Sequence, residues 1–361
     1  MEFDLSDEQR ALRDEARRYL EREAPVSYAR AMMDEPLHHR PGIWRATADL
    51  GWLGLPLPED AGGVGEGFSA LAILLSEMGR VVFPGPYLST VLAGQAVMVA
   101  GTPEQRKELL TPLCAGDLIA TLALDDRDGA AVRARRGGDE WLLEGRQAFV
   151  VDAESAQALV VAAHAPDGPS LFACSRDGVS TTPLDVIDRT RSVSSVEFAD
   201  APARRMDGGA PAIARVLDRA SVAVAAEMLG CAERALELAV DYAKVRMQFG
   251  RPIGSFQAVK HRAASMHVDV ESARNAVWYA AWSIERDTQD ASLAASTAKA
   301  VAGDAARRVT AGAIQIHGGI GFTWEHDAHL YFKRVKLGEA LFGDATFHRE
   351  RAAALLAARY A

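Results

Sequence analysis

Near the C-terminus, the sequence places a cluster of glycines beside several ionisable side chains. Residues 317–350 read HGGIGFTWEHDAHLYFKRVKLGEALFGDATFHRE. The glycines at positions 318, 319 and 321 lack a side chain, so a ligand's phosphates or ring can approach the backbone there. The simpler interpretation is a helix C-terminus followed by a turn. A catalytic site at this place would also need a base, for which a positioned carboxylate is well suited.

Four ionisable residues are candidates for such a base. Asp344 and Glu339 lie in the same segment as His317, and Glu227 lies among apolar residues earlier in the chain, where burial would raise its pKa. Asp344 and Glu227 also have a structural interpretation. Asp344 precedes a helical pattern over 345–360 and is suited to cap it. Glu227 is suited to a salt bridge between helices or on an exposed face.

The elements that must position these residues fall into three zones. Apolar residues recur at helical spacing from Leu5 to about Leu122, with breaks at Pro/Gly-rich stretches. From about Ala123 to Pro202, short β-rich runs alternate with glycine-containing turns. Long helical patterns return from about Pro211. The sequence therefore predicts domains at 1–122, 123–205 and 206–361, in an α+β fold with a middle antiparallel β domain.

This order of elements excludes a common explanation of the glycine cluster. A dinucleotide-binding fingerprint needs a strand before its glycines, whereas residues 305–316 have a helical pattern. The chain also lacks the alternation of strands and helices that builds a doubly wound sheet.

Composition narrows the class of protein further. The chain has 361 residues, of which 49% are hydrophobic, and its net charge of −9 does not favour nucleic-acid binding. The N-terminal segment is acidic and amphipathic, unlike a signal peptide, and no apolar run is long enough to span a membrane. The three cysteines are far apart, which predicts reduced core thiols, no metal site and a cytoplasmic location.

Four segments, in order along the chain, carry a resemblance to a known family. They are LSDEQRALRDEARRYL (5–20), GTPEQRKELLTPLCAGD (101–117), RMQFGRPIGSFQAVKHRAASM (246–266) and QIHGGIGFTWEHDAHLYFKR (315–334). With them the chain resembles the acyl-CoA dehydrogenases over nearly its whole length. The resemblance implies an N-terminal helical domain, a middle β domain and a C-terminal four-helix bundle.

The resemblance also implies a reaction and a cofactor. A carboxylate removes the α-proton of an acyl-CoA while the β-hydride passes to FAD, which lies across a subunit interface and later reduces an electron-transfer flavoprotein. Arg246 would then neutralise the FAD pyrophosphate of a neighbouring chain, Phe249 would pack beside that FAD, and Gln257 would support the loop. The adenosine end would lie against a turn formed by Gln315, Gly318 and Gly319, with His317 packing on the adenine.

The usual base is absent from both positions at which the family places it. In most members a Glu-Gly step precedes the final helix, and here that position holds Phe342 followed by Gly343. A minority place the Glu on the first long C-terminal helix, which corresponds to Ala220. Asp344, two residues past the usual position, stays a candidate for a relocated base, and Glu339 is a weaker one.

The residues that hold the flavin ring in the family are replaced as well. The family's Thr-Glu-Pro segment corresponds to residues 122–134, which contain no hydroxyl side chain. The family's Trp-Ile-Thr corresponds to Phe149, Val150 and Val151, and valine cannot donate the hydrogen bond of the threonine.

Three functional hypotheses follow. In the first, this chain is a non-catalytic subunit that completes the FAD site of a second, catalytic acyl-CoA dehydrogenase chain. The second is a self-sufficient homomeric acyl-CoA dehydrogenase that uses Asp344. The third is a flavin monooxygenase, or a non-redox binding relative of the family. The first explains why residues offered to a neighbour's FAD are present while those for the chain's own flavin ring are replaced.

Overall fold

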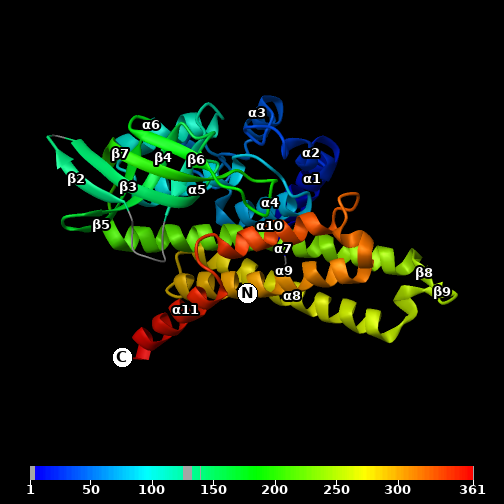
Figure 1. Ribbon diagram of the computed structural model, residues 1–361. Helices are drawn as coiled ribbons and strands as arrows, with labels where there is room; N and C mark the ends of the chain where they lie inside the picture. Colours follow the sequence, from blue (N-terminus) through cyan, green and yellow to red (C-terminus); the bar gives the residue numbers. More distant parts are fainter. Residues whose placement is uncertain (1–4, 125–131, 139, 361) are drawn as a thin grey trace. The chain divides into compact units, whose positions relative to one another are not determined.

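The computed structural model describes residues 5–124, 132–138 and 140–360. Along the chain, helices are followed by strands and then by helices again (Figure 1). The chain divides into two compact units. Unit 1 comprises Met1–Ala29, Ala72–Phe83 and Ser221–Ala361, and unit 2 comprises Arg30–Leu71 and Pro84–Ala220. The three predicted domains divide the chain differently, and their boundaries stay predictions.

The N-terminal zone is helical, as its apolar periodicity predicts. Two of its helices begin at a capping box, in which a Ser or Thr hydroxyl and a Gln side chain satisfy free backbone N–H groups. In the first, Ser6 Oγ accepts from Gln9 N at 3.2 Å, and Thr102 and Gln105 repeat the arrangement. The helices are α1 (Asp7–Glu23), α2 (Val26–Met32), α3 (Pro41–Asp49), α4 (Gly67–Arg80), α5 (Tyr87–Ala100) and α6 (Pro103–Cys114).

The middle zone is a β-sheet in unit 2, in the order β1-β4-β2-β3-β7-β5 with β6 beside β7. Two expected short strands, EWLLEG and AFVVDA, join into the single strand β3. Its pairing with β7 is antiparallel, with irregularities between Leu143 and Gly145 and between Gln147 and Val150. The strands are β1 (Ala120–Ala123), β2 (Arg133–Gly137), β3 (Glu140–Val151), β4 (Ala158–Ala165), β5 (Gly168–Cys174), β6 (Val179–Pro183) and β7 (Val193–Arg205).

The sheet is mixed, which corrects the expectation of an antiparallel β domain. Most pairs are antiparallel, but β1 runs parallel to β4, and β2 touches β4 in parallel register at one pair. Strand β1 follows α6 and is separated from β4 by the β2–β3 hairpin. Consecutive strands joined by a tight turn pair antiparallel. That rule does not apply to β1 and β4, because they are not consecutive.

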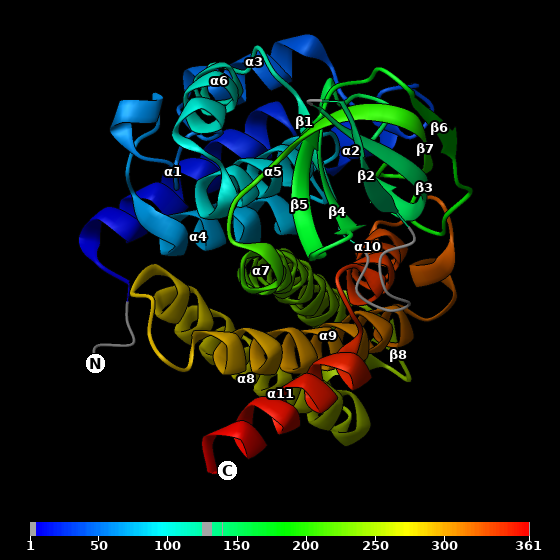
Figure 2. The same cartoon turned by 90° about the vertical axis from the view of Figure 1, so that its left-hand side faces the viewer.

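The C-terminal zone contains one more helix than the predicted four-helix bundle. Helices α8 and α9 lie side by side, and both α10 and α11 pack on α9 (Figure 2). A short hairpin links α7 to α8. The elements are α7 (Gly209–Val245), β8 (Met247–Gln248), β9 (Arg251–Pro252), α8 (Gln257–Glu285), α9 (Ala291–His317), α10 (Ala328–Ala340) and α11 (Ala345–Tyr360).

Two expectations from composition can be compared with the fold. Cys114, Cys174 and Cys231 are all buried free thiols, as predicted. Within the described part of the chain, no helix combines the length and apolar character needed to cross a membrane.

Glycines allow α4 and α7 to approach closely within unit 1. A Cβ added at Gly230 would lie 1.8 Å from the Ser76 carbonyl oxygen, and one at Gly79 would lie 2.1 Å from the Glu227 carbonyl oxygen. The two backbones therefore pack against each other without intervening side chains, and any larger residue must push the helices apart.

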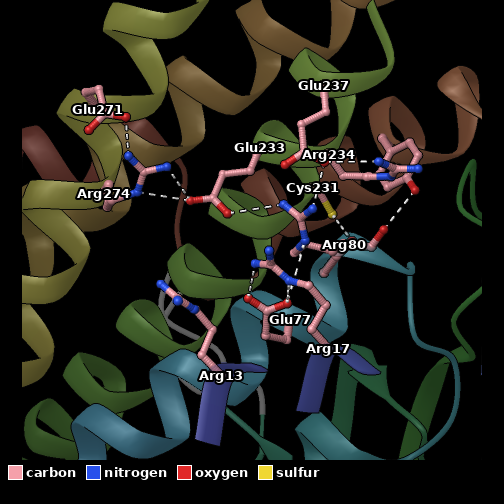
Figure 3. Close-up of polar contacts among 12 residues, drawn as sticks. Arg13, Arg17, Glu77, Arg80, Cys231, Glu233, Arg234, Glu237, Glu271 and Arg274 are labelled. Carbon is pink, nitrogen blue, oxygen red and sulfur yellow. Dashed lines mark hydrogen bonds and ion pairs between the residues drawn. The ribbon is translucent and has the colours of Figure 1, made fainter. Parts of the chain in front are cut away.

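Alternating charges connect four helices of unit 1 (Figure 3). Arg17 on α1 forms two hydrogen bonds with Glu77 on α4, at 2.8 and 2.7 Å. Arg80, also on α4, is only 7% exposed. Its Nη1 lies 3.5 Å from Oε2 of Glu233 on α7. Glu233 also accepts from Arg274 on α8 at 2.8 Å. Removing one member of such a buried set leaves an uncompensated charge, which costs about 3–5 kcal/mol.

The glycine crossing yields a stability prediction. We expect Gly230→Ala to lower the free energy of unfolding by about 2–3 kcal/mol, because the added methyl group overlaps a backbone carbonyl that cannot move independently of α4. The measurement is urea unfolding followed by circular dichroism. As a control, Gly42→Ala on α3 adds a methyl group with no atom within 4 Å, and we expect it to be neutral or stabilising by up to about 1 kcal/mol. Equal effects of the two variants would refute the prediction.

Candidate functional site

The hairpin between α7 and α8 presents an exposed aromatic ring in a strained conformation. Met247 pairs with Pro252 and Gln248 with Arg251, so Phe249 and Gly250 form a two-residue turn. Both turn residues have positive φ, 52° for Phe249 and 73° for Gly250. That conformation is natural for glycine but unfavourable for phenylalanine. The Phe249 side chain is nevertheless 91% exposed, so burial within its own chain does not offset the cost.

Basic and aromatic side chains surround this turn. Arg246 is exposed and has no carboxylate partner among the described residues. Arg251 lies over the ring of Phe256 at 4.2 Å, and Phe249 meets Phe256 edge to face at 6.0 Å. Gln257, exposed, begins α8. The arrangement can accept an anionic group next to an apolar ring surface.

The glycine cluster ends α9 with an open stretch of backbone. Gly318 has a φ of 66°, and a short 3-10 helix, Gly318–Phe322, follows. A Cβ built at Gly318 or Gly319 would meet no atom of the chain within 4 Å. Packing within the chain would therefore leave room for a side chain at Gly319. With Gln315 also exposed, this backbone is accessible to a ligand or to a second chain.

His317 brings the two predicted segments to the same end of unit 1. Its Nδ1 lies 2.8 Å from the carbonyl oxygen of Ala313, to which it donates. Its ring stacks on that of Tyr242, with 4.6 Å between the ring centroids. The centroid of the His326 ring lies 4.2 Å away. Because Tyr242 lies just before Arg246 on the chain, the hairpin and the glycine turn are neighbours despite a wide separation in sequence. His317 has a structural role in this cluster, and its contact with an adenine ring stays a prediction.

At the turn where the resemblance places the base, the carboxylates of the described neighbours Asp344 and Glu339 are engaged in contacts within the chain. Phe342 is half-buried with a φ of 56°. Asp344 Oδ1 accepts a hydrogen bond from Phe347 N at 2.9 Å, which makes Asp344 the cap of α11. Glu339 pairs with Arg307 at 3.1 Å and with Lys336 at 2.6 Å. The capping interpretation of Asp344 is thus confirmed by its hydrogen bond.

Two residues that sequence reasoning missed hold this turn in place. Lys299 on α9, 1% exposed, donates to the carbonyl oxygens of Gly338, Glu339 and Gly343 at 3.0, 3.2 and 2.8 Å. His348 Nε2 donates to the Phe342 carbonyl oxygen at 2.9 Å. A lone lysine within the small-residue run SLAASTAKAVAGDAA was the signal for the first of these. Nothing local distinguishes His348 from an exposed histidine.

Glu227 is a structural carboxylate. It is buried on α7 and accepts from Arg334 Nη1 at 2.8 Å, and Arg334 is fully buried on α10. Arg334 also donates to the carbonyl oxygen of Phe83 at 3.0 Å. The interpretation of Glu227 as an interhelical salt bridge is confirmed. This carboxylate therefore takes part in helix packing inside unit 1.

The β-sheet positions for a flavin ring also lack the expected hydroxyl donor. Val151 is buried, and its carbonyl oxygen accepts from Thr121 Oγ1 at 2.6 Å. Phe149, at the sheet irregularity, has a φ of 57° and is 52% exposed. Of the segment 122–134, residues 125–131 lie outside the described residues. Ala220, the alternative base position, is fully buried and has no ionisable group.

Comparisons with known proteins agree with this fold. Residues 6–117 match the acyl-CoA dehydrogenase N-terminal domain, and residues 207–357 match the acyl-CoA dehydrogenase C-terminal domain. Acyl-CoA dehydrogenase IpdE2 of Mycolicibacterium smegmatis is 34% identical over 340 residues, which covers 94% of this chain and 96% of that protein.

Solved structures show the same architecture. The Tcur3481-Tcur3483 steroid ACAD G363A variant superposes with a TM-score of 0.92 at 34% identity, covering 98% of this chain and 99% of that one. The ChsE4-ChsE5 complex from Mycobacterium tuberculosis gives a TM-score of 0.93 at 30% identity, covering 99% of each chain. The fold is therefore that of a flavoprotein oxidoreductase. The chain belongs to the acyl-CoA dehydrogenase family.

The buried His348 yields a prediction about acid stability. Burial lowers the pKa of His348 from 6.5 to about 4, so the folded chain keeps it neutral. Between these two pH values the unfolded chain binds one more proton than the folded chain, and stability falls as pH falls, by about 3 kcal/mol over the window. Well above pH 6.5, His348 is neutral in both the folded and the unfolded chain, so this loss of stability is absent.

We therefore expect His348→Gln, which keeps an N–H donor, to lose less stability than wild type between about pH 7 and pH 5. Urea unfolding at both pH values measures the difference. His261→Gln, at an exposed position of α8, should follow the wild-type profile. A His348→Gln profile parallel to wild type would show that this histidine does not control the acid limb.

Proposed function

We propose that this chain is a subunit of a FAD-dependent acyl-CoA dehydrogenase and completes the FAD site of a second, catalytic chain. The observation that carries the proposal is Phe249. An exposed aromatic ring held at positive φ, beside Arg246, is costly for the chain alone and is explained by a ligand or chain that packs against it. The positions of the family base, Phe342 and Ala220, cannot take a proton.

The residues on this chain fit one part of FAD and not the other. Arg246 can bind a pyrophosphate through charge-assisted hydrogen bonds, and the open backbone at Gly318 and Gly319 can lie against an adenosine. Bound FAD supplies hydride acceptance from the acyl β-carbon. In the sheet, Val151 offers no hydroxyl to a flavin ring. The fit therefore favours a FAD whose ring is held by the partner chain.

On this proposal each chain has a distinct task in α,β-desaturation of an acyl-CoA thioester. The partner supplies the carboxylate that removes the α-proton and holds the substrate. This chain neutralises phosphate charge with Arg246, shields the cofactor with Phe249 and contributes the Gln315–Gly319 backbone. The likeness to a steroid ACAD and to the two-chain ChsE4-ChsE5 complex supports a steroid-derived acyl group and a heteromer. An electron-transfer flavoprotein would reoxidise the cofactor.

The homomeric alternative depends on Asp344, whose carboxylate caps α11. That hydrogen bond gives Asp344 a structural role that needs no catalytic function. No described residue favours the third alternative, a monooxygenase or a non-redox relative.

The subunit proposal predicts the flavin content of the protein. Purified alone, the chain should bind little FAD. Co-expressed with an acyl-CoA dehydrogenase chain that retains the Glu-Gly step, it should form a heteromer with about one FAD per pair and enoyl-CoA-forming activity. Absorbance near about 450 nm and native mass measure both. Full flavin occupancy and turnover in a homo-oligomer would refute the proposal and make Asp344→Asn the next variant.

The role of Arg246 can be tested in that heteromer. We expect Arg246→Gln to weaken FAD binding about 10- to 100-fold, the worth of a charge-assisted hydrogen bond, without preventing assembly. Lys244→Gln is the matched control, because Lys244 is exposed nearby and already pairs with Asp241 at 3.2 Å. Flavin titration of the apo-heteromer gives both affinities. Equal affinities for the two variants would remove Arg246 from the FAD site.

A further inference from the structure

Unit 2 contains a cavity between two of its helices and one face of its sheet. The cavity has a volume of about 370 Å³ and is partly open to solvent. Helices α5 and α6 form one wall, and strands β1, β4, β5 and β7 form most of the other. Protein interiors hold few voids larger than a water molecule, so a space of this size is unusual for packing alone. It lies within the range of small-molecule sites, roughly 300–1,000 Å³.

Small side chains on the sheet leave room for the cavity. Ala120 pairs with Ala158 between β1 and β4, and Ala173 pairs with Val160 between β4 and β5. Residues paired across strands share a face of the sheet, as do residues two apart along one strand. These four residues therefore share one face, and all of them line the cavity.

The wall formed by the helices is apolar as well. Ala93 and Val97 are one turn apart on α5, and Leu109 and Leu113 are one turn apart on α6. Leu118, which precedes β1, also lines the cavity. Walls of this kind favour a ligand with an apolar body, because burial of each CH₂ group raises affinity about fourfold.

Charged side chains complete the lining, and all of them are exposed. Glu108 on α6 and Arg204 on β7 are each more than half exposed and pair at 2.7 Å, which neutralises both. Glu140, which begins β3, and Asp177, which follows β5, line the same cavity. Asp177 accepts from Ser175 Oγ at 3.3 Å, but neither of these two carboxylates has a cationic partner among the described residues. The exposed rim is therefore acidic.

We propose that this cavity binds a cationic amphiphile, a molecule with an apolar body and a protonated amine at one end. The apolar walls receive the body, and the carboxylates of Glu140 and Asp177 attract the amine at the rim. A fatty acid of the same shape would place a third carboxylate beside these two and is disfavoured by repulsion. The proposal does not rest on the proposed function, because Arg246, Phe249 and Gly318 belong to unit 1 whereas the cavity lies within unit 2.

The test compares probes that share one alkyl chain and differ in the charge of the head group. Octylamine, 1-octanol and octanoate are titrated against the full chain at about pH 7, where the amine is protonated and the acid ionised. Ligand-observed NMR gives the dissociation constants. We expect octylamine to bind about tenfold more tightly than octanoate, with octanol between them. Hexylamine should bind about tenfold more weakly than octylamine, because two fewer CH₂ groups are buried.

Two variants separate the cavity from its rim. Ala173→Leu extends a side chain into the cavity, and we expect it to weaken binding of octylamine and octanol at least about tenfold. Its control is Ala353→Leu at an exposed position of α11, which should bind as wild type does. Glu140→Gln/Asp177→Asn should bring octylamine and octanoate to within about twofold of each other while leaving the affinity for octanol unchanged.

A matched control removes the same charge elsewhere in unit 2. Glu59 and Asp60 are exposed and do not line the cavity, so Glu59→Gln/Asp60→Asn should keep the preference for octylamine.

Three results would overturn the proposal. Octanoate that binds as tightly as octylamine would exclude a site selective for a cationic head group, and so would a preference that survives in Glu140→Gln/Asp177→Asn. Unchanged affinities in a folded Ala173→Leu variant would place the probes outside the cavity. If Ala173→Leu does not fold, the comparison of the two double variants decides the question, because both change exposed side chains only.

Discussion

Two buried guanidinium groups, those of Arg80 and Arg334, determine how the helices of unit 1 pack. A guanidinium cannot lose its charge in a protein and offers five N–H donors, so a buried one must be surrounded by acceptors. Arg334 finds them on α7 and in the segment after α4, at Glu227 and the Phe83 carbonyl oxygen. Arg80 lies between Glu77, Glu233 and Glu237. These requirements connect α1, α4, α7, α8 and α10, while the contact of Gly79 and Gly230 sets how closely α4 and α7 approach.

In this architecture, the carboxylates considered as a catalytic base already bind cations or backbone N–H groups of the chain. Glu227 and Glu233 are bound to arginines, Glu339 to two cations and Asp344 to the N-terminus of α11. The turn at Phe342, where the resemblance places a base, is held as firmly by Lys299 and His348. The exposed Phe249 ring, with its positive φ, and the open backbone at Gly318 lie instead at the hairpin end of unit 1.

Sequence reasoning located much of the fold because the relevant signals are local. Helical periodicity and the β-rich runs each depend on neighbours within a few positions. The same is true of the cap at Asp344. The direction of β1 could not be predicted in this way, since its partner β4 lies beyond an intervening hairpin. The fifth C-terminal helix was visible as a pattern, but its packing on α9 was not.

The sequence by itself determined which residue types stand at each position, and therefore that neither Phe342 nor Ala220 can be a base. Only the tertiary structure decided which distant groups meet. It brought the Phe249 hairpin to the Gly318 turn through the stacking of Tyr242 on His317, gave Glu227 its partner Arg334, and placed Lys299 under the Phe342 turn. The physical reason is that periodicity specifies which face of a helix is buried, whereas the partner across that face is chosen by packing and charge satisfaction over the whole unit.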